Sequence, residues 1–133
     1  MKNLSPNLMV ADVNKTAEFY QQVFGFQVIE KVPDMAEPDS GKWQFVILHL
    51  GGVTIMLQSQ RTLIEDVPSF ANQPVGGTMT LYIDVEDVRG LFEKVKPHIT
   101  LLKEGLYETF YGTIEFTMID PNGYILTFAQ GNG

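Results

Sequence analysis

Residues 10–13 read VADV and residues 85–88 read VEDV, so a short motif returns 75 positions along the chain (from 10 to 85). A glutamate follows each copy at the same interval, as Glu18 and Glu93. In each copy an alternating apolar stretch runs into an aspartate, and a helical pattern follows. A fixed offset of this kind indicates a duplicated unit, so we expect two related modules.

Each aspartate of the repeat is placed to begin a helix. Asp12 and Asp87 carry carboxylates that can accept hydrogen bonds from the free amides of a first helical turn. After Asp12, apolar residues at 13, 17, 20 and 24 form one helix face, and Gly25 suits a left-handed end. After Asp87 the apolar positions are 88, 91, 92 and 95, and Pro97 ends the pattern.

Strand-like segments surround both predicted helices, and each half then has a hairpin. Before the helices lie 7–11 and 78–84, and after them lie 26–31 and 99–103. The hairpins pair 43–50 with 53–58 through Gly51-Gly52, and 113–119 with 124–130 through the turn 120–123 (DPNG). Each half therefore reads β-α-β-β-β. Within the polar segment between the halves we expect a short helix at 62–66, and we expect the loop 33–42 to be mobile.

The length, composition and net charge of the chain limit the class of protein. A chain of 133 residues with 44% hydrophobic residues can form one domain with a real core, and 19% charged residues argue against disorder. No apolar run approaches the roughly 18 residues of a membrane span, and we find no secretory signal. The absence of cysteine excludes disulfides and thiolate chemistry and fits a cytoplasmic protein. A net charge of −7 without a basic stripe argues against nucleic-acid binding.

These motifs, in this order, resemble the vicinal-oxygen-chelate superfamily of glyoxalases, bleomycin-resistance proteins and extradiol dioxygenases. The segments similar to that family's motifs are 9–13 (MVADV), 18–20 (EFY), 23–26 (VFGF), 81–85 (LYIDV), 111–116 (YGTIEF) and 119–124 (IDPNGY). The resemblance implies an α+β fold in which two βαβββ modules, paired by a pseudo-twofold axis, form curved mixed sheets around a cleft. We therefore expect a single domain over 1–133, with module one at about 1–60, a linker at about 61–76 and module two at about 77–133.

The metal enzymes of that family take one ligand from the first strand and one from the last strand of each module. The resemblance places these four positions at Ser5, Met56, Thr80 and Thr127. Hydroxyl and thioether groups are poor ligands for Zn²⁺, Ni²⁺, Mn²⁺ or Fe²⁺, which take imidazole, carboxylate or amide donors. The two histidines, His49 and His98, lie at other positions. We therefore expect no metal and no cofactor.

The alternation of side chains along each strand predicts which residues line the implied cleft, because every second side chain faces the same side of the sheet. To these positions we add the aromatic residues of the third strand and of the approach to the last hairpin, which offer faces for stacking. The predicted ligand-binding residues are Ser5, Asn7, Met9, Trp43, Phe45, Thr54, Met56, Gln58, Thr80, Tyr82, Asp84, Phe110, Tyr111, Glu115 and Thr127. Polar members of this set would be unsatisfied in a dry core, at about 1–3 kcal/mol each, which favours a wet or ligand-accessible cavity.

We expect a small-molecule binding protein of the bleomycin-resistance type. Glu115 with Phe116 resembles the E-F of those proteins, and an acidic protein with aromatic walls suits a cationic or aromatic ligand. The resemblance implies a homodimer, and we expect no nucleic-acid or membrane partner and no catalytic residues. Two alternatives stay open: a lyase, isomerase or dioxygenase with a divalent metal at a site the sequence does not reveal, and a structural or regulatory module whose cleft is filled.

Overall fold

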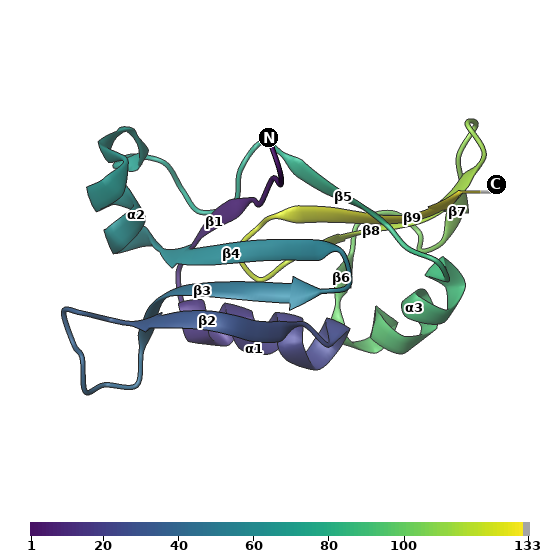
Figure 1. Ribbon diagram of the computed structural model, residues 1–133. Helices are drawn as coiled ribbons and strands as arrows, with labels where there is room; N and C mark the ends of the chain where they lie inside the picture. The colour runs from purple at the N-terminus through teal and green to yellow at the C-terminus, as the bar shows by residue number, and fades with distance from the viewer. Residues whose placement is uncertain (132–133) are drawn as a thin grey trace. The chain divides into compact units, whose positions relative to one another are not determined.

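The computed structural model describes residues 1–131, which form two compact units, the first ending at Gly76 and the second beginning at Gly77 (Figure 1). Each unit contains one β-sheet with a helix packed on one of its faces. None of the helices in the described residues has the length and apolar character needed to cross a membrane.

The first unit is built on a four-stranded sheet of order β1-β4-β3-β2. Its strands are β1 (Asn7–Val10), β2 (Gln27–Pro33), β3 (Trp43–Leu50) and β4 (Val53–Ser59). β1 runs parallel to β4, and the other pairs are antiparallel. Helix α1 (Val13–Phe24) packs against β3 and β4. The fully buried side chains of β1, β3 and β4 are Leu8, Val10, Val46, Leu48, Ile55 and Leu57.

The ends of α1 confirm the helix that the sequence predicted. The Asp12 carboxylate accepts a hydrogen bond from the Lys15 amide at 3.0 Å, and Gly25 takes the left-handed conformation with φ 87°. A second helix, α2 (Gln60–Asp66), begins two residues before the predicted 62, because the Ser59 side chain accepts from the Thr62 amide. A short 3₁₀ turn, η1 (Pro68–Phe70), follows it.

The second unit has a five-stranded sheet of order β5-β9-β8-β6, with β7 paired to β8. Its strands are β5 (Thr80–Asp84), β6 (Thr100–Leu101), β7 (Tyr107–Glu108), β8 (Thr113–Ile119) and β9 (Ile125–Gly131). Helix α3 (Val88–Val95), followed by the 3₁₀ turn η2 (Lys96–His98), packs against β8 and β9. The buried side chains on that face of the two strands are Phe116, Met118, Leu126 and Phe128.

The strand register repeats between the two units. In the first unit Asn7 of β1 lies opposite Met56 of β4, and in the second unit Tyr82 of β5 lies opposite Thr127 of β9. The Asp87 carboxylate accepts a hydrogen bond from the Gly90 amide at 3.0 Å. The Asp12 carboxylate caps α1 in the same way, by accepting from the Lys15 amide. The repeat read from the sequence is therefore a structural repeat of a β-α-β-β-β module, to which the second copy adds the short strand β7.

The segment after α3 departs from the prediction. The expected strand at 99–103 is only Thr100–Leu101, because the chain turns at Lys103, where φ is 66°. The strand β7 was not predicted, because its two residues are too few to show an alternation of apolar and polar side chains. This turn and this short strand bring residues 103–112 alongside β8, where the candidate site lies.

Candidate functional site

A buried carboxylate lies on the face of the second sheet that α3 does not cover. Glu115 of β8 is 3% exposed, and its Oε2 accepts hydrogen bonds from the hydroxyls of Tyr82 at 2.7 Å and Tyr111 at 3.0 Å. Oε2 also accepts from Thr113 at 2.8 Å, and Oε1 accepts from the Tyr107 hydroxyl at 3.2 Å. Four hydroxyl hydrogens are therefore directed at one carboxylate.

Strand alternation and register assemble this cluster. Because side chains alternate along a strand, Thr113 and Glu115 lie on the same face of β8. Tyr107 lies directly opposite Glu115 on β7, and Tyr82 of β5 reaches the cluster from across β9. We call Tyr82, Tyr107 and Tyr111, together with the carboxylate they share, the tyrosine cage.

The hydroxyl donors decide the charge state of Glu115. Burial disfavours its charged form, but the hydrogen bonds from the three phenols and from Thr113 outweigh burial and hold the pKa of Glu115 below its ordinary value. The hydrogen bond to Glu115, with desolvation as a smaller cause, raises the pKa of Tyr82 to about 12. At neutral pH the cage therefore contains a charged carboxylate beside the neutral phenol of Tyr82.

An open pocket of about 470 Å³ lies at the cage, within the size range of small-molecule sites. Its aromatic walls are Tyr82, Tyr107, Phe110 and Tyr111, and its polar lining is Lys103, Glu108, Thr109, Glu115 and Thr127. Phe110 is fully exposed, and Tyr82 and Tyr111 are each more than half exposed, so aromatic surface faces solvent here. The arrangement offers aromatic faces around a fixed negative charge.

The comparisons with known proteins agree with this fold. The sequence model of the Glyoxalase/Bleomycin resistance protein/Dioxygenase superfamily matches residues 4–128. The chain belongs to this superfamily. The search of the curated proteins found no match.

Solved structures of similar fold come from several members of the superfamily and from a protein of unknown function. The latter, from Agrobacterium tumefaciens str. C58, is 26% identical, with a TM-score of 0.76, over 98% of this chain and 94% of that chain. A glyoxalase/bleomycin resistance protein/dioxygenase family enzyme from Burkholderia phytofirmans PsJN is 24% identical, with a TM-score of 0.72, over 95% of each chain. A bleomycin resistance determinant encoded on the transposon Tn5 is 18% identical, with a TM-score of 0.69, over 100% of each chain.

The metal positions implied by the superfamily do not fit a divalent ion in this chain. Ser5, Met56, Thr80 and Thr127 offer only hydroxyl and thioether groups, and the Thr127 hydroxyl is hydrogen-bonded to Thr117 at 3.0 Å. Within residues 1–131 no three His, Asp or Glu side chains come together as a metal-binding group.

Five of the predicted ligand-binding residues meet in the pocket of the second unit. They are Tyr82, Phe110, Tyr111, Glu115 and Thr127. Thr80 and Asp84 share the exposed face of β5 with Tyr82 but lie outside this pocket. The sequence did not single out Tyr107, Lys103 or Thr113. For Thr113 a signal existed, because it alternates with Glu115 and Thr117 along the strand.

Most of the predicted residues of the first unit share the sheet face that α1 does not cover. Asn7 donates to Gln58 at 2.9 Å, Met56 lies opposite Asn7, and Thr54 is hydrogen-bonded to His49 at 2.9 Å. Phe45 lies opposite Gln58, and Met9 lies opposite Gln58 on the other neighbouring strand. Ser5 precedes β1, next to Pro6, whose carbonyl accepts from the Met56 amide.

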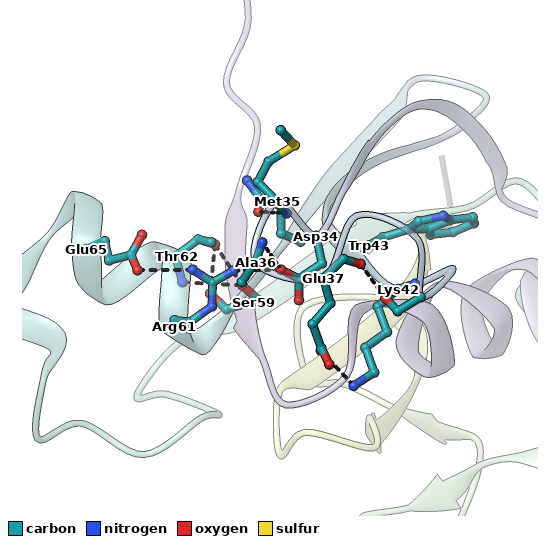
Figure 2. A network of polar contacts seen from close by, with 12 residues as sticks. Asp34, Met35, Ala36, Glu37, Lys42, Trp43, Ser59, Arg61, Thr62 and Glu65 are labelled. Atoms are coloured by element: carbon teal, nitrogen blue, oxygen red, sulfur yellow. Dashed lines mark hydrogen bonds and ion pairs between the residues drawn. The ribbon is translucent and has the colours of Figure 1, made fainter.

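Trp43 lies apart from this set, in a pocket of about 290 Å³ beside the start of α1. Figure 2 shows the polar network around it, in which Arg61 pairs with Asp34 at 2.8 Å and with Glu65 at 3.1 Å. The Trp43 amide donates to Asn14 at 2.8 Å. The pairing of β2 with β3 shifts register between Val32 and Pro33, immediately beside Trp43.

One argument from the sequence is wrong. We expected polar side chains along the strands to lack partners unless water or a ligand entered, but they bond to one another. Thr117 is hydrogen-bonded to both Tyr107 and Thr127, and Asn7 is bonded to Gln58. In the described part of the chain no buried side-chain nitrogen or oxygen lacks a partner. The support for a ligand site is therefore the open aromatic pocket and not unsatisfied polarity.

Proposed function

We propose that this protein binds a small organic cation with an aromatic body in the pocket of the tyrosine cage, and that it acts as a binding protein. The observation that carries the proposal is that three tyrosine hydroxyls are directed at the buried carboxylate of Glu115. Membership of a superfamily that includes bleomycin resistance proteins supports it.

The direction of the hydrogen bonds selects the kind of ligand. Because each phenol of the cage gives its only hydroxyl hydrogen to Glu115, its oxygen has only lone pairs left to offer the pocket. Thr113 also donates to Glu115. A ligand complementary to these oxygens must therefore bring hydrogen-bond donors or a positive charge, whereas an anion would find no free hydrogen among the three phenols.

The aromatic faces favour the same ligand. A cation is attracted to the face of an aromatic ring, and quaternary ammonium groups are bound in this way by cages of aromatic side chains. A phenol that donates to a carboxylate is polarised by it, which increases the negative potential of the ring. The net charge of −7 adds a general attraction for cations.

The test is isothermal titration calorimetry with N-methylquinolinium and with neutral quinoline, at pH 8 and low salt. We expect the wild-type protein to bind the cation more tightly than the neutral compound. Glu115→Gln removes the buried charge and should weaken cation binding by about tenfold while changing quinoline binding little.

The matched control is Glu37→Gln, which removes an exposed carboxylate of the first unit with the same change in net charge. Circular dichroism verifies that both variants are folded. Equal cation affinity in the two variants, or equal binding of both compounds by the wild type, would contradict the proposal. The homodimer and the cytoplasmic location stay predictions, and analytical ultracentrifugation tests the first of them.

A further inference from the structure

The pocket of the tyrosine cage already contains a positive charge from the chain itself. Lys103 lines the pocket, and its Nζ lies 4.3 Å from the centroid of the Tyr107 ring. Lys103 forms no ion pair with any acidic group of residues 1–131, so the ring is the partner that the structure gives its ammonium group. The Tyr107 hydroxyl in turn donates to Glu115.

We infer that Lys103 is a built-in competitor: its ammonium group occupies the place of a ligand's cation, and binding requires it to leave. The inference rests on the proposed function and adds a residue that sets affinity and specificity. A ring face accommodates one cation at contact distance, and two like charges at that distance repel each other. A cationic ligand that binds on the Tyr107 face must therefore displace Lys103, whereas a neutral aromatic molecule can use the other walls.

The local backbone permits this exchange without a change in the sheet. Lys103 lies in the exposed connection between β6 and β7, and the Leu102 amide just before it is fixed to the Thr117 carbonyl at 2.9 Å. Lys103 has φ 66° and Gly105 has φ 106°, so this turn directs the lysine stem toward the pocket. A four-carbon stem on a surface turn can rotate away while the strands stay in place.

The test compares Lys103→Met with the wild type, using N-methylquinolinium and quinoline. Methionine keeps the length of the side chain and removes its charge. We expect the cation to bind about two- to fivefold more tightly to Lys103→Met, which is the strength of an exposed cation–π contact, and quinoline affinity to change by less than about 1.5-fold.

Two matched variants isolate the cause. Lys103→Arg keeps the cation and should behave as the wild type does. Lys31→Met removes a similar contact outside the pocket, since Lys31 Nζ lies 4.9 Å from the Trp43 ring centroid in the first unit, and it should also leave binding unchanged.

A second measurement follows Lys103 directly. Protons held over a ring face are shifted upfield in the NMR spectrum, so the Lys103 side-chain signals should move downfield as N-methylquinolinium is added to the wild type and stay in place with quinoline. Unchanged or weaker cation binding by Lys103→Met, or lysine signals that do not move when the cation binds, would overturn the inference while leaving the proposed function standing. If no variant binds either compound, the proposed function fails and the inference fails with it.

Discussion

Phe45 and Glu115 occupy corresponding places in the two sheets. Phe45 lies opposite Gln58, two residues beyond Met56, and Glu115 lies opposite Ala129, two residues beyond Thr127. In one module the place holds a partly exposed aromatic ring, and in the other it holds a buried carboxylate with four hydroxyl donors. The backbone of the repeat is shared, whereas the chemistry of the open faces is not.

The helix-covered faces show the opposite behaviour, because both modules bury aliphatic and aromatic side chains there at equivalent positions. Leu48 and Met118 correspond in register, and each is 0% exposed. Packing against a helix constrains residue type strongly, since a void or a polar group in a packed interior is destabilising. The open faces carry no such constraint, so they are where two copies of one scaffold can differ.

The largest effect is expected in the two cores. Leu48→Ala and Met118→Ala should each lower the free energy of unfolding by about 2–5 kcal/mol, because each deletes a fully buried side chain and leaves a cavity. Chemical denaturation followed by circular dichroism measures both. If one of the two substitutions lowered the free energy of unfolding by less than about 1 kcal/mol, the two cores would not be equivalent.

A smaller effect is expected at the two helix starts. Asp12→Ala and Asp87→Ala remove the carboxylates that cap α1 and α3, and each should cost about 1 kcal/mol. Asp39→Ala, in an exposed loop of the first unit, is the control and should change stability little. If the two substitutions lowered the free energy of unfolding by different amounts, Asp12 and Asp87 would have the same capping geometry but contribute differently to stability.

The smallest effects are expected from pH, at the carboxylate and the Tyr82 phenol of the tyrosine cage. The pKa of Glu115 is lowered in the folded protein, so its contribution to stability is present above its unfolded pKa and is lost as the pH falls through the folded value. The stability difference between the wild type and Glu115→Gln should therefore shrink in acid. Denaturation curves from pH 6 downward measure it, and a difference that grows as the pH falls would contradict the sign.

Tyr82 gives the same kind of test in alkali. Its pKa is raised to about 12, so its contribution is fully present below the unfolded phenol value and is lost as the pH rises through the folded one. Ultraviolet titration curves of the wild type and of Tyr82→Phe should differ by one phenol that ionises near pH 12. The stability change is small because Tyr82 is 52% exposed.

The sequence predicted the scaffold well because periodicity and caps are local signals. Asp12, Asp87 and Gly25 each do in the structure what their type and spacing indicated. The site was predicted only in part. Glu115, Tyr82 and Tyr111 were named as separate cleft residues, but their shared hydrogen bonds depend on register across three strands, which no single segment encodes.

Tyr107 and Lys103 were missed for a different physical reason. They lie on a two-residue strand and on a surface turn, where neither apolar alternation nor a turn motif is visible in the sequence. Their place in the pocket follows from the pairing of β7 with β8. Such a contact is fixed by tertiary pairing, which overrides the weak local preference of so short a segment.

The network around Arg61 has a consequence for protein engineering. Arg61 belongs to α2, which the sequence assigned to a linker, and both of its acidic partners, Asp34 and Glu65, lie before Gly76. The seam between the halves therefore falls at the Gly76–Gly77 peptide bond and not at the end of β4. A chimaera that grafts the cage-bearing half onto another first half should be joined at that bond, because a splice near residue 60 would divide Arg61 from Asp34.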